Sequence, residues 1–256
     1  MNILVLVKQT FDAEEKIVIE NGMIKEDGAE FILNPYDEYA VEEAIKLKEE
    51  YGAEVTILTV GPERSESVLR TTLAMGADKG IILELEEEDK EVDEYTLSKY
   101  IVAAIEGQSY DLILGGNMAV DTGAGQVAIR MAEELGIPHV STITSLTLEG
   151  SKATVNRDVE GDVEVVKVNL PFLATTQQGL NEPRYPSLPG IMKAKKKTLT
   201  RLSVEDLELA DDVTNRTSVQ VHYLPEKKKA GQLVQGEVHE QVQELVQLLR
   251  SESKVI

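Results

Sequence analysis

The sequence predicts an α/β fold, in which a mostly parallel, doubly wound sheet carries an antiparallel extension and an extended C-terminal arm. Over the first half of the chain, short continuous apolar runs alternate with helical patterns, which is typical of strand–helix–strand units with right-handed crossovers. After Pro138 the pattern changes to consecutive strands separated by glycine turns. Beyond Leu202 the apolar runs become short and scattered, which indicates an extended arm.

The strands of the first half are predicted from apolar runs, because a strand buried on both faces has no polar side. The first helix, in DEYAVEEAIKLKEEYG, ends at Gly52, a residue that suits the left-handed cap of a helix. Asn21-Gly22 favours a type I′ turn, and therefore a β-hairpin, within KIVIENGMIK. The expected strands are 3–7, 54–60, 80–85 and 111–116, and the later helices are 65–75, 95–105 and 127–135.

The second half predicts an antiparallel meander at 146–176 that extends the same sheet, with turns at Glu149-Gly150 and Glu160-Gly161-Asp162. We expect the acidic run at 84–90 to be a solvated loop. The chain thus divides into an α/β domain at 1–200, which includes a loop at 176–198, and an arm at 201–256. The arm is expected to hold a short acidic helix (Val204–Leu207), a strand (Val219–Tyr223), a lysine run at 227–229 and an amphipathic helix (Val238–Leu249).

The composition excludes several classes of function. A net charge of −20 over 256 residues disfavours binding to nucleic acid and to anionic lipid. The absence of cysteine excludes disulfides and fits a reducing cytoplasm, which is the location we expect. No apolar run reaches about 18 residues, and MNILVLVK lacks the features of a secretory signal. The three histidines are not spaced for a metal, and no Walker, G-x-G-x-x-G or G-x-S-x-G motif occurs, so we expect no catalytic residues.

One segment, DLILGGNMAVDTGAGQVAIRMAEELG, has the pattern of a ligand site: a buried strand, a glycine-rich loop and a helix. The glycines allow the backbone to approach a ligand, and the N–H groups at the start of the helix can bind a phosphate. TVGP at 59–62 and NPYDE at 34–38 are loops of the same sheet edge, where open α/β sheets bind ligands. The pattern therefore predicts a nucleotide pocket, although glycines that serve only an ordinary βα turn would look the same.

A second segment, LNEPRYPSLPGIMKAKKK at 180–197, is basic in an otherwise acidic chain. Its three prolines restrict the backbone, so less conformational entropy is lost if the loop docks on a partner. Leu188, between Ser187 and Pro189, has few local neighbours, and either fills a pocket on a partner or folds back into the core. The lysines either face a partner or are solvated.

Four stretches of the chain match one known family in order and spacing. They are LVLVKQTFD, NPYDEYAVEEAIKLKE, TVGP followed by LRTTLAMGADKGI, and RDVEGDVEVVKVNLPFLATTQQGLNEPRYPSLPGIMKAKKK. Over nearly its whole length the chain resembles the small (beta) subunit of electron-transfer flavoproteins. The resemblance implies a heterodimer with an alpha subunit and one FAD between the subunits. This flavin accepts electrons from dehydrogenases such as acyl-CoA dehydrogenases and passes them to an electron-transport acceptor, while the beta subunit binds AMP structurally.

The resemblance also implies the positions that bind cofactors. Residues 34–37 would form one wall of the AMP site, Val60 would face the adenine, and 116–127 would wrap the phosphate and ribose. Tyr36 either approaches the FAD ring or packs against the first loop, where Ala13 replaces the family's tyrosine. The expected cofactor-binding residues are Leu6, Asn34, Pro35, Tyr36, Asp37, Val60, Gly116, Asn117, Met118, Ala119, Val120, Asp121, Thr122, Gly123, Ala124, Gly125, Gln126 and Val127.

Partner contacts follow from the same resemblance. Residues 176–198 would recognise the dehydrogenase, with Leu188 as the anchor, and the arm would pack on the alpha subunit. Asp158 falls where the family has a carboxylate that pairs with an arginine of the mobile alpha-subunit domain; otherwise it is a strand residue beside a turn. The lysines would face the dehydrogenase or the alpha subunit. The expected partner-binding residues are Arg184, Tyr185, Pro186, Ser187, Leu188, Pro189, Ile191, Met192 and Asp158.

Two other functions stay open. The loop at 121–126 has the length seen in electron-bifurcating members of the family, in which a second FAD takes the place of AMP, but Ala124 stands where those members have threonine. From a different class, a nucleotide-binding regulatory module would also bind an adenine nucleotide, but would be colourless and would need no alpha subunit.

Overall fold

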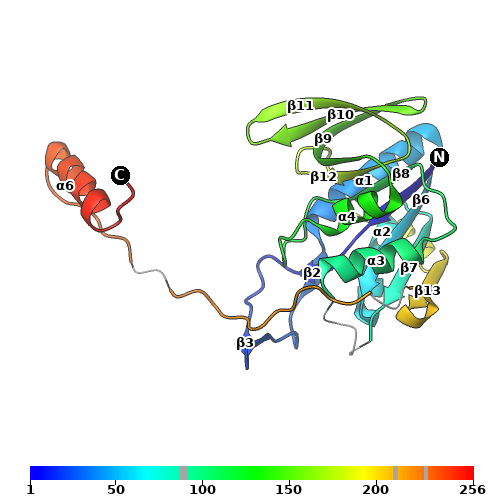
Figure 1. The fold of residues 1–256 in the computed structure, drawn as a ribbon, viewed down its shortest axis with the longest axis horizontal. Helices are drawn as coiled ribbons and strands as arrows, with labels where there is room; N and C mark the ends of the chain where they lie inside the picture. The colour runs from blue at the N-terminus through cyan, green and yellow to red at the C-terminus, as the bar shows by residue number, and fades with distance from the viewer. Residues whose placement is uncertain (87–91, 210–212, 228–229) are drawn as a thin grey trace.

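A long, twisted sheet forms the centre of the protein (Figure 1). The structure is a computed structural model that describes residues 1–86, 92–209, 213–227 and 230–256. Among these residues nine strands pair in the order β11-β10-β9-β12-β8-β1-β6-β7-β13. The seven strands β9-β12-β8-β1-β6-β7-β13 are parallel to their neighbours in this order. At the other edge, β10 runs antiparallel to β9 and β11. The strands are β1 (Asn2–Leu6), β6 (Glu54–Gly61), β7 (Lys79–Glu84), β8 (Leu112–Gly116), β9 (His139–Glu149), β10 (Lys152–Val159), β11 (Asp162–Asn169), β12 (Phe172–Thr176) and β13 (Leu199–Ser203).

Helices cover both faces of the parallel part of the sheet. Ile3 and Val5 of β1 belong to the same core cluster as apolar residues of α1 and α2. Leu4 and Leu6 belong to the opposite cluster, with residues of α3 and α4. Successive residues of a strand point to opposite faces, so burial on both sides explains the continuous apolar run at 3–7. The helices are α1 (Pro35–Tyr51), α2 (Glu66–Met75), α3 (Glu94–Ala104), α4 (Val127–Leu135), α5 (Leu188–Ala194) and α6 (Val238–Ser251), with 3-10 turns at Glu63–Ser65 and Val204–Asp206.

The predicted fold class is confirmed, and so are the elements of the first half, within one or two residues at each end. The predicted hairpin is present as β3 (Ile19–Glu20) and β4 (Met23–Ile24). Asn21 and Gly22 both have positive φ, as a type I′ turn requires. A second small antiparallel pair, β2 (Gln9–Phe11) with β5 (Phe31–Leu33), carries the chain from β1 to the start of α1.

Several features of the second half differ from the prediction. The antiparallel meander expected at 146–176 ends at Asn169: Phe172–Thr176 form β12, which is parallel to β8 and β9. The predicted strand at Val219–Tyr223 is wrong: these described residues form no strand, and the His222 N–H donates to Gly22 O at 2.8 Å. A strand needs a neighbour along its length, and this segment only crosses the tip of the β3–β4 hairpin. Neither α5 nor β13 was predicted: residues 176–198 were expected to be a loop, and no strand was expected at 199–203.

Packing against the sheet continues beyond residue 200. β13 pairs in parallel with β7, and Leu202, Val204 and Leu207 pack around Leu83. The expected acidic helix at Val204–Leu207 is a single 3-10 turn over Val204–Asp206. Parts of the predicted acidic run at 84–90 and lysine run at 227–229 lie outside the described residues.

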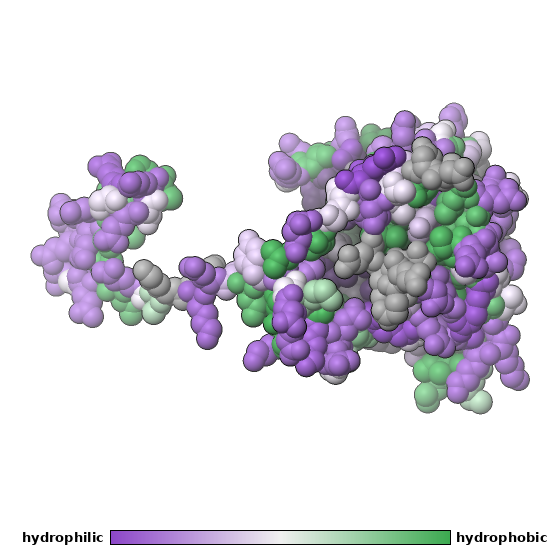
Figure 2. Space-filling view, turned by 60° about the horizontal axis from the view of Figure 1, so that its bottom comes forward, coloured by the Kyte–Doolittle hydropathy of each residue, from purple (hydrophilic) through white to green (hydrophobic). Residues whose placement is uncertain are grey.

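The predicted amphipathic helix at the C-terminus is confirmed as α6, and it lies away from the body at the end of an extended segment (Figure 1). Figure 2 shows the arm as a narrow, mainly hydrophilic extension with apolar side chains on its terminal part. Val238, Val242 and Leu245 share one face of α6 and are exposed.

Candidate functional site

A cavity of about 190 Å³ lies at the carboxyl ends of β1, β6 and β8, the sheet edge where the sequence predicted a ligand. One wall consists of the glycine-rich loop and the first residues of α4, and Leu97 and Ile101 of α3 also line the cavity. Predicted residues that line it are Leu6, Asn34, Asp37, Val60, Gly116, Asn117, Met118, Ala119, Thr122, Ala124, Gly125, Gln126 and Val127.

Some predicted residues do not line this cavity, and others line it that were not predicted. Pro35, Tyr36, Val120, Asp121 and Gly123 are not part of the lining. Four of the nine additional residues come from α3 and the segment before it, where a helical pattern alone does not show which side faces a ligand; the others lie next to predicted positions on β1, β6, β8 and α4. The nine are Val7, Lys8, Leu58, Val92, Glu94, Leu97, Ile101, Gly115 and Ala128.

Asn34 and Asp37 join three loops at the edge of the cavity. The Asn34 side-chain amide donates to Asp37 Oδ1 and to Met118 O, both at 2.9 Å, and Asn34 Oδ1 accepts from the Val120 N–H at 3.2 Å. Asp37 accepts from the backbone N–H groups of Lys8 at 2.7 Å and Gly116 at 3.0 Å. The two buried side chains therefore fix the ends of β1 and β8 against the start of α1.

The carboxyl group of Asp37 has an unusual protonation equilibrium for an aspartate. Burial raises its pKa to about 7, and the opposing effects are hydrogen bonds from Asn34, Lys8 and Gly116 and the charge of Lys8. Between about pH 4 and 7 the folded chain holds a proton that the unfolded chain has released. The contribution of Asp37 to stability is therefore largest below this window and is lost as the pH rises through 7.

Asp37→Asn tests this linkage, because asparagine cannot titrate. The variant loses stability at every pH, since its NH₂ group faces backbone donors. We expect the difference in free energy of unfolding between wild type and variant to be larger at pH 5 than at pH 8.5, by on the order of 2 kcal/mol. Urea denaturation at the two pH values measures it, and an equal or smaller difference at pH 5 would contradict the raised pKa.

The glycine-rich loop places backbone, not side chains, against the cavity. Gly125 has φ of +61°, and a Cβ there would lie 3.1 Å from Asn117 O, so glycine fits best at this position. α4 follows directly, and within the described residues no side chain caps its N-terminus. The first N–H groups of a helix have no partner within the helix, and here they lie at the end that borders the cavity.

A lysine adds positive charge on the cavity wall. Lys8 lines the cavity, and its Nζ lies 2.8 Å from Asp121 Oδ1, where both side chains are partly exposed. This ion pair joins the end of β1 to the glycine-rich loop. It also explains the place of Asp121, which belongs to the loop but does not line the cavity.

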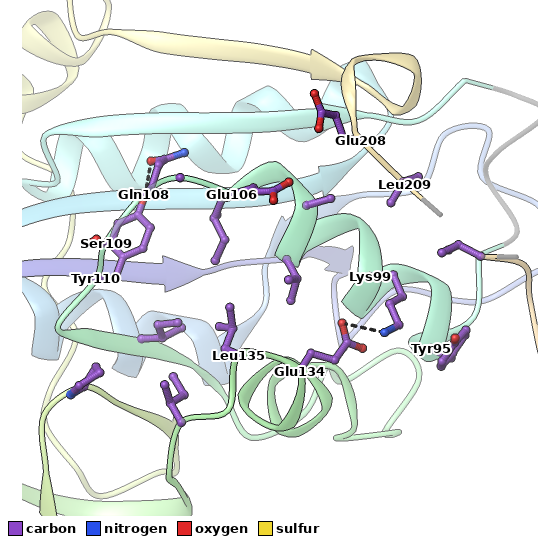
Figure 3. Close-up of a pocket in the computed structure, with 18 residues that line it drawn as sticks. Tyr95, Lys99, Glu106, Gln108, Ser109, Tyr110, Glu134, Leu135, Glu208 and Leu209 are labelled. Carbon is purple, nitrogen blue, oxygen red and sulfur yellow. Dashed lines mark hydrogen bonds and ion pairs between the residues drawn. The ribbon is translucent and has the colours of Figure 1, made fainter. Parts of the chain in front are cut away.

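A larger depression of about 810 Å³ lies elsewhere, between α3 and α4 (Figure 3). It borders the amino ends of β8 and β12, through Tyr110 and Pro171, and not the carboxyl ends at which open α/β sheets bind ligands. Several of its polar groups are paired with each other: Lys99 lies 3.4 Å from Glu134, and the Tyr110 hydroxyl donates to Gln108 at 2.7 Å. None of the predicted site residues lines it.

The predicted partner residues form an exposed platform around α5. Tyr185, Leu188 and Met192 are 93%, 80% and 73% exposed. The side chain of Arg184 instead lies against α1, between Glu42 and Glu49. Asp158 lies apart from the platform, exposed on β10 opposite Val163 of β11.

The fold and the site define an α/β protein with a ligand cavity at the carboxyl ends of its parallel strands. A family model described as "Electron transfer flavoprotein domain" matches residues 21–207. The chain is 57% identical to the electron transfer flavoprotein subunit beta of Bacillus subtilis over 257 residues, covering all of both chains. The corresponding subunit of Syntrophomonas wolfei is 39% identical, over all of this chain and 98% of the relative. The human subunit is 36% identical, over 90% of this chain and 91% of the relative.

The chain belongs to the beta subunits of electron transfer flavoproteins, as its sequence indicated. It is thus a subunit of an electron carrier. No helix in the described part of the chain is long and apolar enough to cross a membrane. The described residues also contain no group of three or more histidine, aspartate or glutamate side chains placed to hold a metal ion.

Proposed function

We propose that this chain pairs with an alpha subunit, that the two hold one FAD between them, and that the cavity beside α4 binds AMP. The heterodimer accepts electrons from dehydrogenases such as acyl-CoA dehydrogenases, which dock on residues 176–198, and passes them to an electron-transport acceptor. The observation that carries the proposal is the cavity itself, in which a glycine-rich backbone and an uncapped helix N-terminus meet at the carboxyl ends of the strands.

The residues present fit a mononucleotide. Backbone N–H groups at the start of α4 suit a phosphate, and Lys8, which follows β1 and is paired with Asp121, places an ammonium group in the lining. Leu6, Val60 and Ile101 offer an apolar surface to a base. A volume of about 190 Å³ leaves less room for FAD, the larger of the two ligands, than for AMP, and this favours AMP over a second FAD.

Two exposed features are suited to the alpha subunit. The apolar stripe of α6, formed by Val238, Val242 and Leu245, has no partner surface among the described residues and would be buried by a second chain. Asp158, exposed on β10, is proposed to pair with an arginine of the mobile alpha-subunit domain. Such an exposed pair contributes little stability by itself, but it can bias a nearly balanced domain equilibrium.

The nucleotide content of the heterodimer tests the proposal. After acid extraction of the co-expressed subunits, mass spectrometry and flavin absorbance are expected to give one AMP and one FAD per heterodimer. Gly125→Ala should reduce the AMP content, because the new methyl group would press on Asn117 O. Gly150→Ala is the matched control, since Gly150 has the same φ of +61° but open space around it, away from the cavity.

Each alternative has its own outcome in this experiment. Two flavins and no AMP per heterodimer would identify the electron-bifurcating type. A colourless chain with AMP that forms no complex with an alpha subunit would indicate a regulatory module. Wild-type protein without any adenine nucleotide would exclude the pocket.

A further inference from the structure

The segment that leads to the exposed platform is attached to α1 at three successive points. The Thr176 hydroxyl donates to Tyr36 O at 2.9 Å. The Asn181 side-chain amide donates to Tyr39 O at 3.0 Å and to Glu43 Oε2 at 2.9 Å. Arg184 then reaches further along α1, and the platform begins at the next residue.

Arg184 makes the most extensive of these contacts. Its Nε and Nη2 each donate to Glu42 at 2.9 Å, and its Nη1 and Nη2 donate to Glu49 at 2.6 and 3.0 Å. Its backbone N–H also donates to Glu42 Oε2 at 3.1 Å. The Glu42 side chain is only 7% exposed, so this contact is largely shielded from solvent. Hydrogen bonds to two carboxylates fix both the position and the plane of a guanidinium group. The ammonium group of a lysine, which is not planar, would not be oriented in this way.

The other end of the platform is fixed to α2. The Ser187 hydroxyl caps α5 by accepting from the Gly190 N–H at 3.1 Å. Gly190 packs so closely on α2 that an added Cβ would overlap Ala74 O. Lys197 Nζ donates to Leu73 O and Ala77 O at the end of α2, at 2.9 and 2.6 Å. Between these attachments, Tyr185, Leu188 and Met192 remain exposed.

We infer that Arg184 is a positioning residue for partner docking, which holds the Tyr185–Met192 platform in its docking conformation through Glu42 and Glu49. The inference rests on the proposed docking role of residues 176–198. A platform held in place before docking loses less conformational entropy on binding, so its affinity is higher for the same contacts. All three guanidinium nitrogens of Arg184 already donate within the chain, which argues against a direct role on the partner surface.

The test combines steady-state kinetics with hydrogen exchange on the heterodimer. The probe is an acyl-CoA dehydrogenase reduced by its acyl-CoA substrate, with the heterodimer as electron acceptor. Arg184→Gln and Glu42→Gln are each expected to raise the KM for the heterodimer about tenfold and to leave kcat within about twofold. The KM measured with the double variant should not exceed the higher of the two single-variant KM values, because the two side chains act as one unit. Arg184→Lys, which keeps the charge, should be intermediate.

Hydrogen exchange without dehydrogenase separates positioning from contact. Amides of residues 185–192 should exchange about tenfold faster in Arg184→Gln and in Glu42→Gln than in wild type. The control is Lys25→Gln, which removes an exposed ion pair with Glu20 on the β3–β4 hairpin, outside the platform and its attachments, and should change neither readout. Thermal denaturation verifies that each variant is folded.

Two results would overturn the inference: unchanged exchange at 185–192, or a raised KM in Arg184→Gln with a normal KM in Glu42→Gln. The second pattern would mean that Arg184 contacts the partner directly. Failure of the proposed docking role looks different. If Leu188→Ala leaves KM unchanged, the platform does not dock this dehydrogenase, and the exchange data alone decide whether Arg184 holds it.

Discussion

Gly116→Ala is expected to lower the free energy of unfolding of the chain by about 3 kcal/mol. Gly116 ends β8, and an added methyl group would overlap Asp37 Oδ1 and lie 2.8 Å from Tyr36 Cβ and 2.9 Å from Asp37 N. These atoms belong to the first turn of α1, which is held by the buried pair Asn34 and Asp37, so they cannot move aside easily. If β8 and the start of α1 move apart to make room for the methyl group, the hydrogen bond from the Gly116 N–H to Asp37 is weakened and the cavity is distorted.

Two other glycines give a graded comparison in the same urea-denaturation experiment. Gly123 has φ of +66° but open space around it, so Gly123→Ala should cost only about 1 kcal/mol, the usual penalty of a Cβ in the left-handed region. Gly231, in the arm, has neither a positive φ nor a close neighbour, and alanine there should be neutral within about 0.5 kcal/mol. A loss at Gly116 no greater than at Gly123 would contradict the close approach of β8 and α1.

Local patterns were sufficient to predict the main strands and helices of the first half of the chain. Burial on both faces leaves continuous apolar runs, and the Asn21-Gly22 turn has its own residue preference, so each element is visible in its own residues. The strand predicted at Val219–Tyr223 shows the limit of this reasoning. Its alternation is strand-like, but whether a strand forms depends on a neighbour that the local sequence does not contain.

Long-range contacts account for most of what the sequence did not reveal about the site. Residues near 34, 60 and 116–127 could be assigned to one sheet edge because the carboxyl ends of parallel strands meet there. Leu97 and Ile101 could not, because the side of α3 that faces the cavity depends on how α3 packs against α4. Likewise Arg184 is 142 residues from Glu42 in sequence, and nothing local indicates that its charge is used within the chain.

Leu188→Ala is expected to reduce kcat/KM for electron transfer from an acyl-CoA dehydrogenase to the heterodimer by about 30-fold. A leucine side chain that becomes buried on a partner contributes roughly 2 kcal/mol to docking, and each 1.4 kcal/mol corresponds to about a factor of ten. Leu188 is 80% exposed at the start of α5, where Ser187 caps the helix and Pro189 restricts the backbone. The chain itself therefore gains almost nothing from this side chain, and it is available to a partner.

Because Leu188 is exposed, its loss should leave the stability of the subunit unchanged within about 0.5 kcal/mol, and the flavin content should remain that of wild type. Met23→Ala is the matched control: Met23 is 64% exposed on the β3–β4 hairpin, outside the platform, and its loss should alter neither stability nor electron transfer. Stopped-flow reduction of the flavin by the reduced dehydrogenase measures the transfer, and urea denaturation measures the stability. A Leu188→Ala variant that is destabilised by more than about 1 kcal/mol yet accepts electrons at the wild-type rate would show that Leu188 supports the subunit itself, and the docking surface would have to lie elsewhere.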